Sequence, residues 1–339
     1  MNTFFETKQK MSVKGAILVM LVLCGSEGAI AQFKSSNFVP YSSVSVGLGT
    51  SSYYGDLAPY SRPVVSTFGL LRWSATANYT RHFTPHFGAR ASFTWARITG
   101  DDFKVHQGDR AVPNLFARNL HFRNDLKEFA LTGIFKIIPD SRSYDRRPQF
   151  SPYLFAGIAA VAHNPVARVP DLDGDRWVKL QPLGTEGQGS PGYDKPYSLV
   201  QFAIPFGFGV RYKINARFDV GAELGFRFTS TDYLDDVSKN YPDPSVLKDD
   251  LARAMSNRSA EPTAARKGGD RTAGLQKFLA ETYQITDPSI DPFVAIQQTD
   301  YASPGTPRGT HPWRNDAYMT GSIHVTYILG SPIKCPPLK

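Results

Sequence analysis

Acidic side chains that could bind a cation gather at two places in the sequence. Asp171–Asp175 has the Asp-Leu-Asp-Gly-Asp start of a calcium loop, but its twelfth position is Pro182, where an EF-hand requires a bidentate glutamate. Asp232, Asp235 and Asp236 place further carboxylates close together. Aspartates are equally common in turns, where their side chains accept hydrogen bonds from nearby backbone N–H groups. We therefore interpret both segments as turns and keep cation binding as the alternative.

Histidine and serine side chains offer no complete catalytic arrangement. His82 and His86 flank a proline turn without a neighbouring carboxylate, which disfavours a metal site. His324 and Ser322 share one face of a predicted strand, yet the sequence supplies no third member of a triad. We therefore expect a hydrogen-bonded network around His324, no enzymatic activity and no cofactor.

Residues 1–31 have the pattern of an export signal. Lysines precede the apolar stretch Gly15–Cys24, and Ala29–Ala31 is a small-residue cleavage site. The apolar stretch is too short to cross a bilayer as a helix, which disfavours a retained anchor. Lipidation at Cys24 is a further alternative, disfavoured because a bulky leucine precedes it. Cleavage would leave a mature chain that begins at Gln32.

Composition narrows the class of protein. The 339 residues have a mean hydropathy of −0.29 and are 20% charged, which is too polar for a helical membrane protein. The 23 Phe and 16 Tyr beside 28 Gly favour many short strands and turns. The net charge of +8 comes from scattered Lys and Arg, so no nucleic-acid partner is expected. Signal cleavage would leave Cys335 as the single cysteine, which excludes an internal disulfide.

Apolar and polar residues alternate with period two along most of the mature chain, which is typical of strands. The predicted strands, the last three being the clearest, are 42–50, 68–81, 87–99, 118–138, 150–163, 202–214, 218–230 and 317–329. The alternation changes phase within 118–138. We interpret that change as a β-bulge, or as a strand whose outer half lies beyond the apolar layer.

The connections between these strands alternate strictly between short and long, which places every long loop at one end of an up-and-down barrel. Outer-membrane barrels have this asymmetry, with short periplasmic turns and long outer loops. The sequence therefore predicts an all-β, eight-stranded antiparallel up-and-down transmembrane β-barrel over 42–329, after a lead at 32–41. The loop 231–316 contains two possible short helices, 244–257 and 273–283, and a periplasmic tail follows at 330–339.

The side chains on the two faces of each strand indicate which face is inside. The apolar faces are large and aromatic, as contact with membrane lipid requires, whereas an arginine facing mid-bilayer costs about 2–4 kcal/mol. A soluble barrel of the lipocalin type is the alternative. The polar faces pair glycine with charge, and an eight-stranded lumen is narrow enough for side chains to plug it. The predicted lumen charge network is Arg72, Arg90, Glu128, Lys136, Arg211, Glu223, Arg227 and His324.

Six strings along the chain match a known family. They are Ser51–Leu57, Ala96–Asp102, Arg118–Leu126, Tyr153–Ile158, Pro182–Gly189 and Thr231–Ser238. On these strings the chain resembles the PorG-like outer-membrane β-barrel proteins of Bacteroidetes, named for a component of the type IX secretion machinery. The chain departs from that family in its long fourth loop and in lacking a terminal aromatic residue. The resemblance implies an outer-membrane protein without enzymatic activity that binds the periplasmic ring of the secretion machine.

Four surfaces are candidates for partner binding. One is the C-terminal tail at 330–339, and another is the predicted periplasmic turn with Arg142, Arg146 and Arg147. The other two are outer loops that can equally serve as a plug: Gly184, Thr185, Glu186, Gly187, Gln188 and Gly189 in one, and Asp232, Tyr233, Asp235 and Asp236 in the other. The alternatives to a secretion component are a rim or lumen enzyme that acts on outer-membrane lipid, and a passive structural barrel or narrow channel.

Overall fold

The computed structural model describes residues 38–59, 63–105, 113–170, 175–310 and 315–330. The predicted export signal, residues 171–174 of the possible calcium loop and Cys335 lie outside these ranges. No helix among the described residues is long and apolar enough to cross a membrane.

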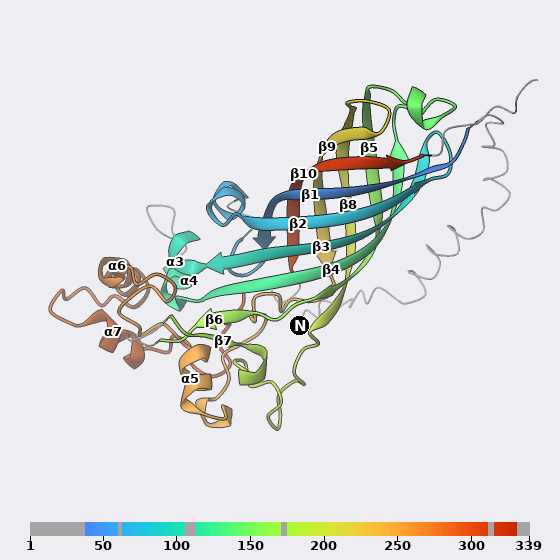
Figure 1. Cartoon of the computed structure of the whole chain (residues 1–339). Helices are drawn as coiled ribbons and strands as arrows, with labels where there is room; N and C mark the ends of the chain where they lie inside the picture. The colour runs from blue at the N-terminus through green and yellow to red at the C-terminus, as the bar shows by residue number, and fades with distance from the viewer. Residues whose placement is uncertain (1–37, 60–62, 106–112, 171–174, 311–314, 331–339) are drawn as a thin grey trace, which may run out of the picture.

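Eight long strands form a closed antiparallel barrel (Figure 1). Each strand pairs with the next one along the chain, and the last pairs with the first from Ser42 opposite Leu329 to Tyr54 opposite Ala317. The predicted fold class is thereby confirmed. The strands are β1 (Tyr41–Tyr54), β2 (Arg72–His82), β3 (Phe87–Asp101), β4 (His121–Lys136), β5 (Phe150–Ala162), β8 (Val200–Lys213), β9 (Phe218–Thr229) and β10 (Ala317–Leu329).

The phase change predicted near the start of β4 does not come from a bulge. The pairing of β4 with β3 keeps one register from Phe135 opposite Phe87 to His121 opposite Asp101. Strand β4 instead continues beyond the apolar outer surface, where the inward-facing residues Phe122 and Leu126 are fully buried. They belong to a hydrophobic core at the outer mouth of the barrel. The second of the two interpretations is therefore the correct one.

Short connections join the strands at one end of the barrel, and long connections join them at the other. The short ones are 83–86, 137–149 with η2 (Tyr144–Arg146), and 214–217. The long loops 55–71, 102–120, 163–199 and 230–316, where described, lie together over the opposite end and are called the loop cap (Figure 1). Both β1 and β10 have their free ends at the short-turn end.

The loop cap contains most of the remaining elements. They are η1 (Val65–Gly69), α3 (Asp102–Val105), α4 (Pro113–Arg118), β6 (Val166–Arg168), β7 (Trp177–Lys179), η3 (Gln181–Leu183), η4 (Pro244–Val246), α5 (Asp250–Ser256), α6 (Thr272–Tyr283), α7 (Pro292–Ala295) and η5 (Ile296–Gln298). The helix predicted over 244–257 is split into η4 and α5, because the Asp249 side chain caps α5 by accepting a hydrogen bond from the Ala252 N–H. The helix predicted over 273–283 corresponds to α6. The hairpin of β6 and β7 was not predicted.

Candidate functional site: the lumen network and the loop cap

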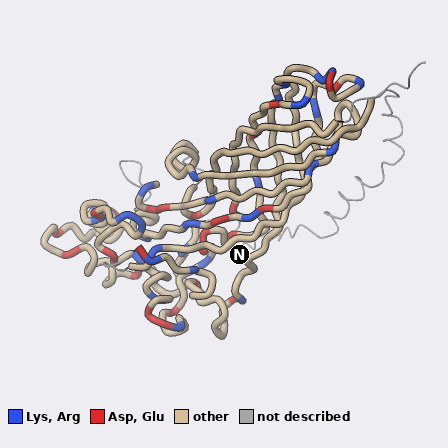
Figure 2. The backbone as a smooth tube through the Cα atoms, viewed as in Figure 1, with Lys and Arg blue, Asp and Glu red and all other residues tan. Residues whose placement is uncertain are grey.

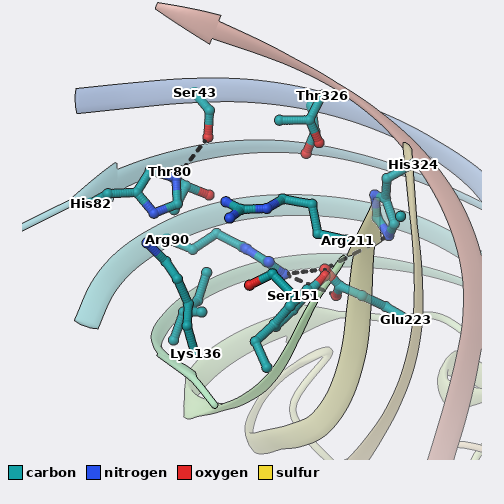
Figure 3. Close-up of a pocket in the computed structure, with 14 residues that line it drawn as sticks. Ser43, Thr80, His82, Arg90, Lys136, Ser151, Arg211, Glu223, His324 and Thr326 are labelled. Atoms are coloured by element: carbon teal, nitrogen blue, oxygen red, sulfur yellow. Dashed lines mark hydrogen bonds and ion pairs between the residues drawn. The ribbon is translucent and has the colours of Figure 1, made fainter. Parts of the chain in front are cut away.

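Charged side chains from opposite walls of the barrel meet inside the lumen. Arg90 on β3 and Glu223 on β9 form an ion pair in which a single nitrogen, Nη1, lies 2.7 Å from Oε1 and 2.9 Å from Oε2. Both side chains point into the pocket drawn in Figure 3. The Tyr153 hydroxyl donates to the same carboxylate over 2.5 Å. These contacts tie three strands together across the interior.

A second group of charges closes the short-turn end of the lumen. Asp140, in the connection between β4 and β5, pairs with Arg211 at 2.6 Å and with Lys136. Although burial favours the neutral acid, Arg211 and Lys136 hold the pKa of Asp140 well below its usual value. Beside this group, Arg147 and Asp219 form a fully buried ion pair at 2.6 Å.

A third group occupies the outer half of the lumen. The Nε of Arg227 lies 3.0 Å from an oxygen of Glu128, which also accepts a hydrogen bond from the Tyr318 hydroxyl. Two of the lumen cavities have volumes of about 50 and 30 Å³, enough for only a few water molecules each. The described lumen is therefore plugged by side chains, as an eight-stranded barrel allows.

Two of the predicted site residues lie where they were not expected. Arg72 is the first residue of β2, at the outer mouth, and its Nη1 donates to the carbonyl of Leu71 over 2.7 Å. Arg147 was predicted as part of an exposed periplasmic surface, but it is buried and bonded to Asp219 and to turn carbonyls. Arg142 and Arg146 in the same turn are exposed.

His324 lies in the lumen without the geometry of a catalytic triad. Its Nε2 is 2.7 Å from the Ser322 hydroxyl, and an oxygen of Glu223 lies 4.0 Å from that same nitrogen. A triad needs the nucleophile and the acid on opposite ring nitrogens. The other nitrogen, Nδ1, faces the Asn78 amide at 3.4 Å. The trio therefore forms part of a hydrogen-bonded network.

The loop cap is joined by buried arginines that reach across several loops. Arg118 pairs with Asp102 at 2.7 Å and donates to the carbonyls of Asp56 at 2.9 Å and Arg308 at 2.7 Å. Arg308 in turn lies 3.2 Å from Glu186 and donates to the carbonyl of Asp236 over 2.7 Å. Arg118 and Arg308 thus connect all four long loops.

The two predicted plug loops bond to each other inside the cap. Thr185 donates to Asp236 over 2.5 Å, and the backbone N–H of Ser238 donates to Glu186 over 2.9 Å. Burial raises the pKa of Asp236 to about 6 and raises that of Glu186, although Arg308 opposes both shifts. Gly184 and Gly187 have positive φ angles of 60° and 82°. A residue with a side chain would be strained in this backbone conformation. Much of the Gly184–Gly189 loop is therefore part of the plug.

Tyr53 joins the cap to the barrel through two carboxyl groups that share one hydroxyl. Its oxygen lies 2.7 Å from Asp235 Oδ2 and 2.6 Å from Asp316 Oδ1, and all three side chains are buried. A phenol has one hydrogen to donate. At the second short contact the carboxyl group must therefore donate a proton of its own. We call these three residues the Tyr53 latch.

Asp235 and Asp236, two of the acidic residues predicted as a possible cation site, point in different directions. Asp235 points to Tyr53, whereas Asp236 points to Thr185 and to Tyr197. Among the described residues no group of three or more His, Cys, Asp or Glu side chains is placed to hold a metal ion.

Several members of both networks were not predicted, and the sequence held an indication only for those in the lumen. The predicted lumen set contains five Lys or Arg side chains against two glutamates. Buried cations need partners, so further acids were required. The structure supplies them as Asp140 and Asp219. Tyr53, Arg308 and Asp316 had no comparable indication in the sequence.

Comparisons with known proteins give one family match and several solved barrel structures of low sequence identity. A family described as "Domain of unknown function (DUF6089)" matches residues 16–169. No curated protein sequence matches significantly. The attachment invasion locus protein Ail of Yersinia pestis, in complex with the heparin analogue sucrose octasulfate, is similar with 10% identity and a TM-score of 0.33, over 86% of this chain and 99% of Ail.

Two further barrel structures are similar to the same degree. Neisserial surface protein A has 7% identity and a TM-score of 0.34, over 84% of this chain and 96% of that one. The N-terminal β-barrel domain of OprF from Pseudomonas aeruginosa has 9% identity and a TM-score of 0.31, over 85% and 98% of the two chains.

Replacing Arg227 with Met should destabilise the barrel by about 3–5 kcal/mol, because Glu128 would be left as an unpaired buried charge. The double variant Arg227→Met/Glu128→Gln should recover most of that loss. Denaturant unfolding of the refolded protein measures both values. Equal losses in the single and double variants would show that the loss does not come from an uncompensated charge on Glu128.

The Tyr53 latch predicts a stability that falls as pH rises. Burial raises the pKa of Asp316 and of Asp235 well above the usual value, each with help from neighbouring aspartates, and raises that of Asp232 to about 8. The folded state therefore binds more protons than the unfolded chain above about pH 4, and stability is lost as pH rises through the raised values.

Asp316→Asn imitates the protonated acid and should weaken this dependence, which thermal unfolding between pH 5 and pH 9 would measure as a smaller loss of stability than in the wild-type protein. Asp232, whose pKa is raised to about 8, still contributes in the variant. Asp287→Asn is the matched control, because Asp287 is exposed in the loop cap. A gain in the stability of the wild-type protein between pH 5 and pH 9 would contradict a protonated carboxyl group in the Tyr53 latch.

Proposed function

We propose that the protein is an integral barrel of the outer membrane that serves the type IX secretion machinery as a partner-binding component. Two features support this proposal. The outer surface of the barrel is suited to lipid, and five of the six strings that carry the resemblance to PorG-like proteins meet in the loop cap. The sixth, Tyr153–Ile158, lies in β5. The outer surface supports the membrane location, and the strings of the resemblance support the secretion role.

The outer surface of the barrel carries an apolar belt. Leu48 and Ile323, near the middle of their strands, are 74% and 66% exposed. Aromatic side chains flank the belt at both ends, with Trp73 and Trp95 towards the loop cap, and Phe87 and Phe218 towards the short turns. This arrangement of an apolar band between two aromatic girdles is that of a transmembrane barrel. Outer-membrane lipid is therefore the first partner we propose.

The strings of the resemblance supply the buried groups of the loop cap. Tyr53, Asp102, Arg118, Glu186 and Asp235 each come from a different string. Arg118 and Glu186 bond to other loops, Tyr53 bonds to Asp235, and Asp102 pairs with Arg118 in its own loop. A protein that shares these strings is expected to close its barrel with the same plug. The plug and the ion pairs of the lumen favour neither a channel nor a lumen enzyme.

The surface left for a periplasmic partner is the short-turn end of the barrel. Arg142 and Arg146 are exposed there, as is Arg217 in the next short turn. Exposed cations attract a partner with an acidic surface and mainly raise its rate of association. We propose that ring subunits of the secretion machine bind at this basic end.

Affinity purification from outer membranes tests the secretion role. The wild-type barrel should recover ring subunits, and Arg142→Glu/Arg146→Glu should lose them, because the charge of the contact is reversed. Lys195→Glu/Lys277→Glu in the loop cap is the matched control and should keep them. If the wild-type protein recovers no ring subunit, the protein is a passive structural barrel.

The membrane location predicts a strong effect of charge on the belt. Ile323→Arg should cost about 2–4 kcal/mol of stability in phospholipid vesicles, because it places a cation near the bilayer centre. Leu329→Arg at the end of the same strand should cost about 0–1 kcal/mol. Unfolding by guanidinium from vesicles measures both. Equal and small effects would contradict a membrane-spanning barrel.

A further inference from the structure

Basic side chains from three segments of the chain gather on the outer mouth of the barrel. Arg72 begins β2, Lys104 lies in α3, and Arg266 and Lys267 lie in a turn of the fourth loop. Arg266 lies 3.5 Å from Asp101, the residue directly before α3. Burial lowers the pKa of Lys104, and the charges of Arg72, Lys267 and Arg266 lower it further. In Figure 2, blue segments lie close together around α3. We call this surface, with Arg97, the basic rim.

The neighbouring carboxylates balance only part of this charge. Arg97 pairs with Asp125 at 2.6 Å, and Arg266 lies 3.5 Å from Asp101. Within the described part of the chain, no carboxylate lies within ion-pair distance of the other three cations of the basic rim. Like charges held together from separate segments repel each other, so an anion bound there stabilises the arrangement.

The position of the basic rim selects the kind of anion. Arg97 stacks over Trp73 with its guanidinium carbon 5.6 Å from the ring centroid, and Trp73 packs edge-on against Trp95 in the outer aromatic girdle. Girdle aromatics sit at the level of lipid headgroups. The basic rim therefore begins where the headgroups of the outer leaflet begin.

A short apolar segment beside the basic rim favours lipid over a free anion. The exposed fractions of Val64 and Phe68, at the turn η1, are 68% and 70%. Lys104 holds this turn by donating to the carbonyl of Gly69. In Figure 1 the coil that precedes β2 stands outside the barrel wall, on the side of α3. Apolar side chains next to cations match acyl chains next to a phosphorylated headgroup.

We propose that the basic rim binds the phosphate groups of lipid headgroups in the outer leaflet of the membrane. Arg72, Lys104 and Lys267 contact the phosphates, and Phe68 contacts the acyl chains. This proposal depends on the membrane location proposed above but not on the secretion role. A failure to recover ring subunits would therefore not contradict it.

Titration of the purified full-length barrel in neutral detergent with diphosphorylated lipid A tests the proposal, with bound lipid counted by native mass spectrometry. Each cation near an anionic headgroup layer contributes roughly fivefold in affinity, so Arg72→Gln/Lys104→Gln/Lys267→Gln should weaken binding on the order of a hundredfold. Lipid A without phosphates should bind the wild-type protein as weakly as the variant binds the phosphorylated form.

The control variant is Arg142→Gln/Arg146→Gln/Arg217→Gln, which loses the same charge at the short-turn end and should bind normally. Lys267→Gln alone changes only an exposed turn and should lose roughly fivefold even if the triple variant fails to fold. Equal losses in both triple variants, or equal binding of lipid A with and without phosphates, would overturn the proposal. Displacement by inorganic phosphate at equal concentration would overturn it by identifying a free anion as the ligand.

Discussion

The structure depends on pairing charges in a lumen that has almost no room for water. An eight-stranded barrel encloses a space that side chains fill, and a charge left unpaired there is costly. Arg90 and Glu223 come from β3 and β9, and Arg227 and Glu128 from β9 and β4, so each pair connects strands that are not neighbours in the sheet. The pairs thereby brace the barrel wall from inside, which backbone hydrogen bonds between adjacent strands cannot do.

The same requirement continues into the loop cap. Arg118 and Arg308 are as deeply buried as the lumen cations, and each is surrounded by carbonyl and carboxylate oxygens from other loops. The hydrophobic core at the outer mouth contains residues of both the barrel wall, such as Leu126, and the loop cap, such as Leu234. The long loops held in this way form a plug over the barrel, so they do not widen its lumen. The exposed rims are left as the surfaces on which other molecules can act.

The barrel could be predicted because the polarity of each residue in a strand indicates which face of the sheet its side chain occupies. Alternation assigns every side chain a face, and loop lengths assign the two ends, so the inward direction of Arg90, Glu128 and Glu223 followed from the sequence. The alternation does not indicate how far along the barrel axis a residue lies. Arg72 has the right alternation but lies at the mouth. Arg147 and Asp140 lie in a turn, where period two does not apply, and their burial depends on how the turn folds back.

The loop cap was not predictable in the same way, because its contacts join residues far apart in sequence without any period. Tyr53 meets Asp316 across 263 positions, and Arg118 meets Arg308 across 190. The resemblance identified the strings that matter but not what they bond. Their burial gives them a structural role first: a string can be distinctive because it builds the plug. Residues that meet a partner must stay exposed, so we place them at the rims, where the sequence carries charge without a pattern.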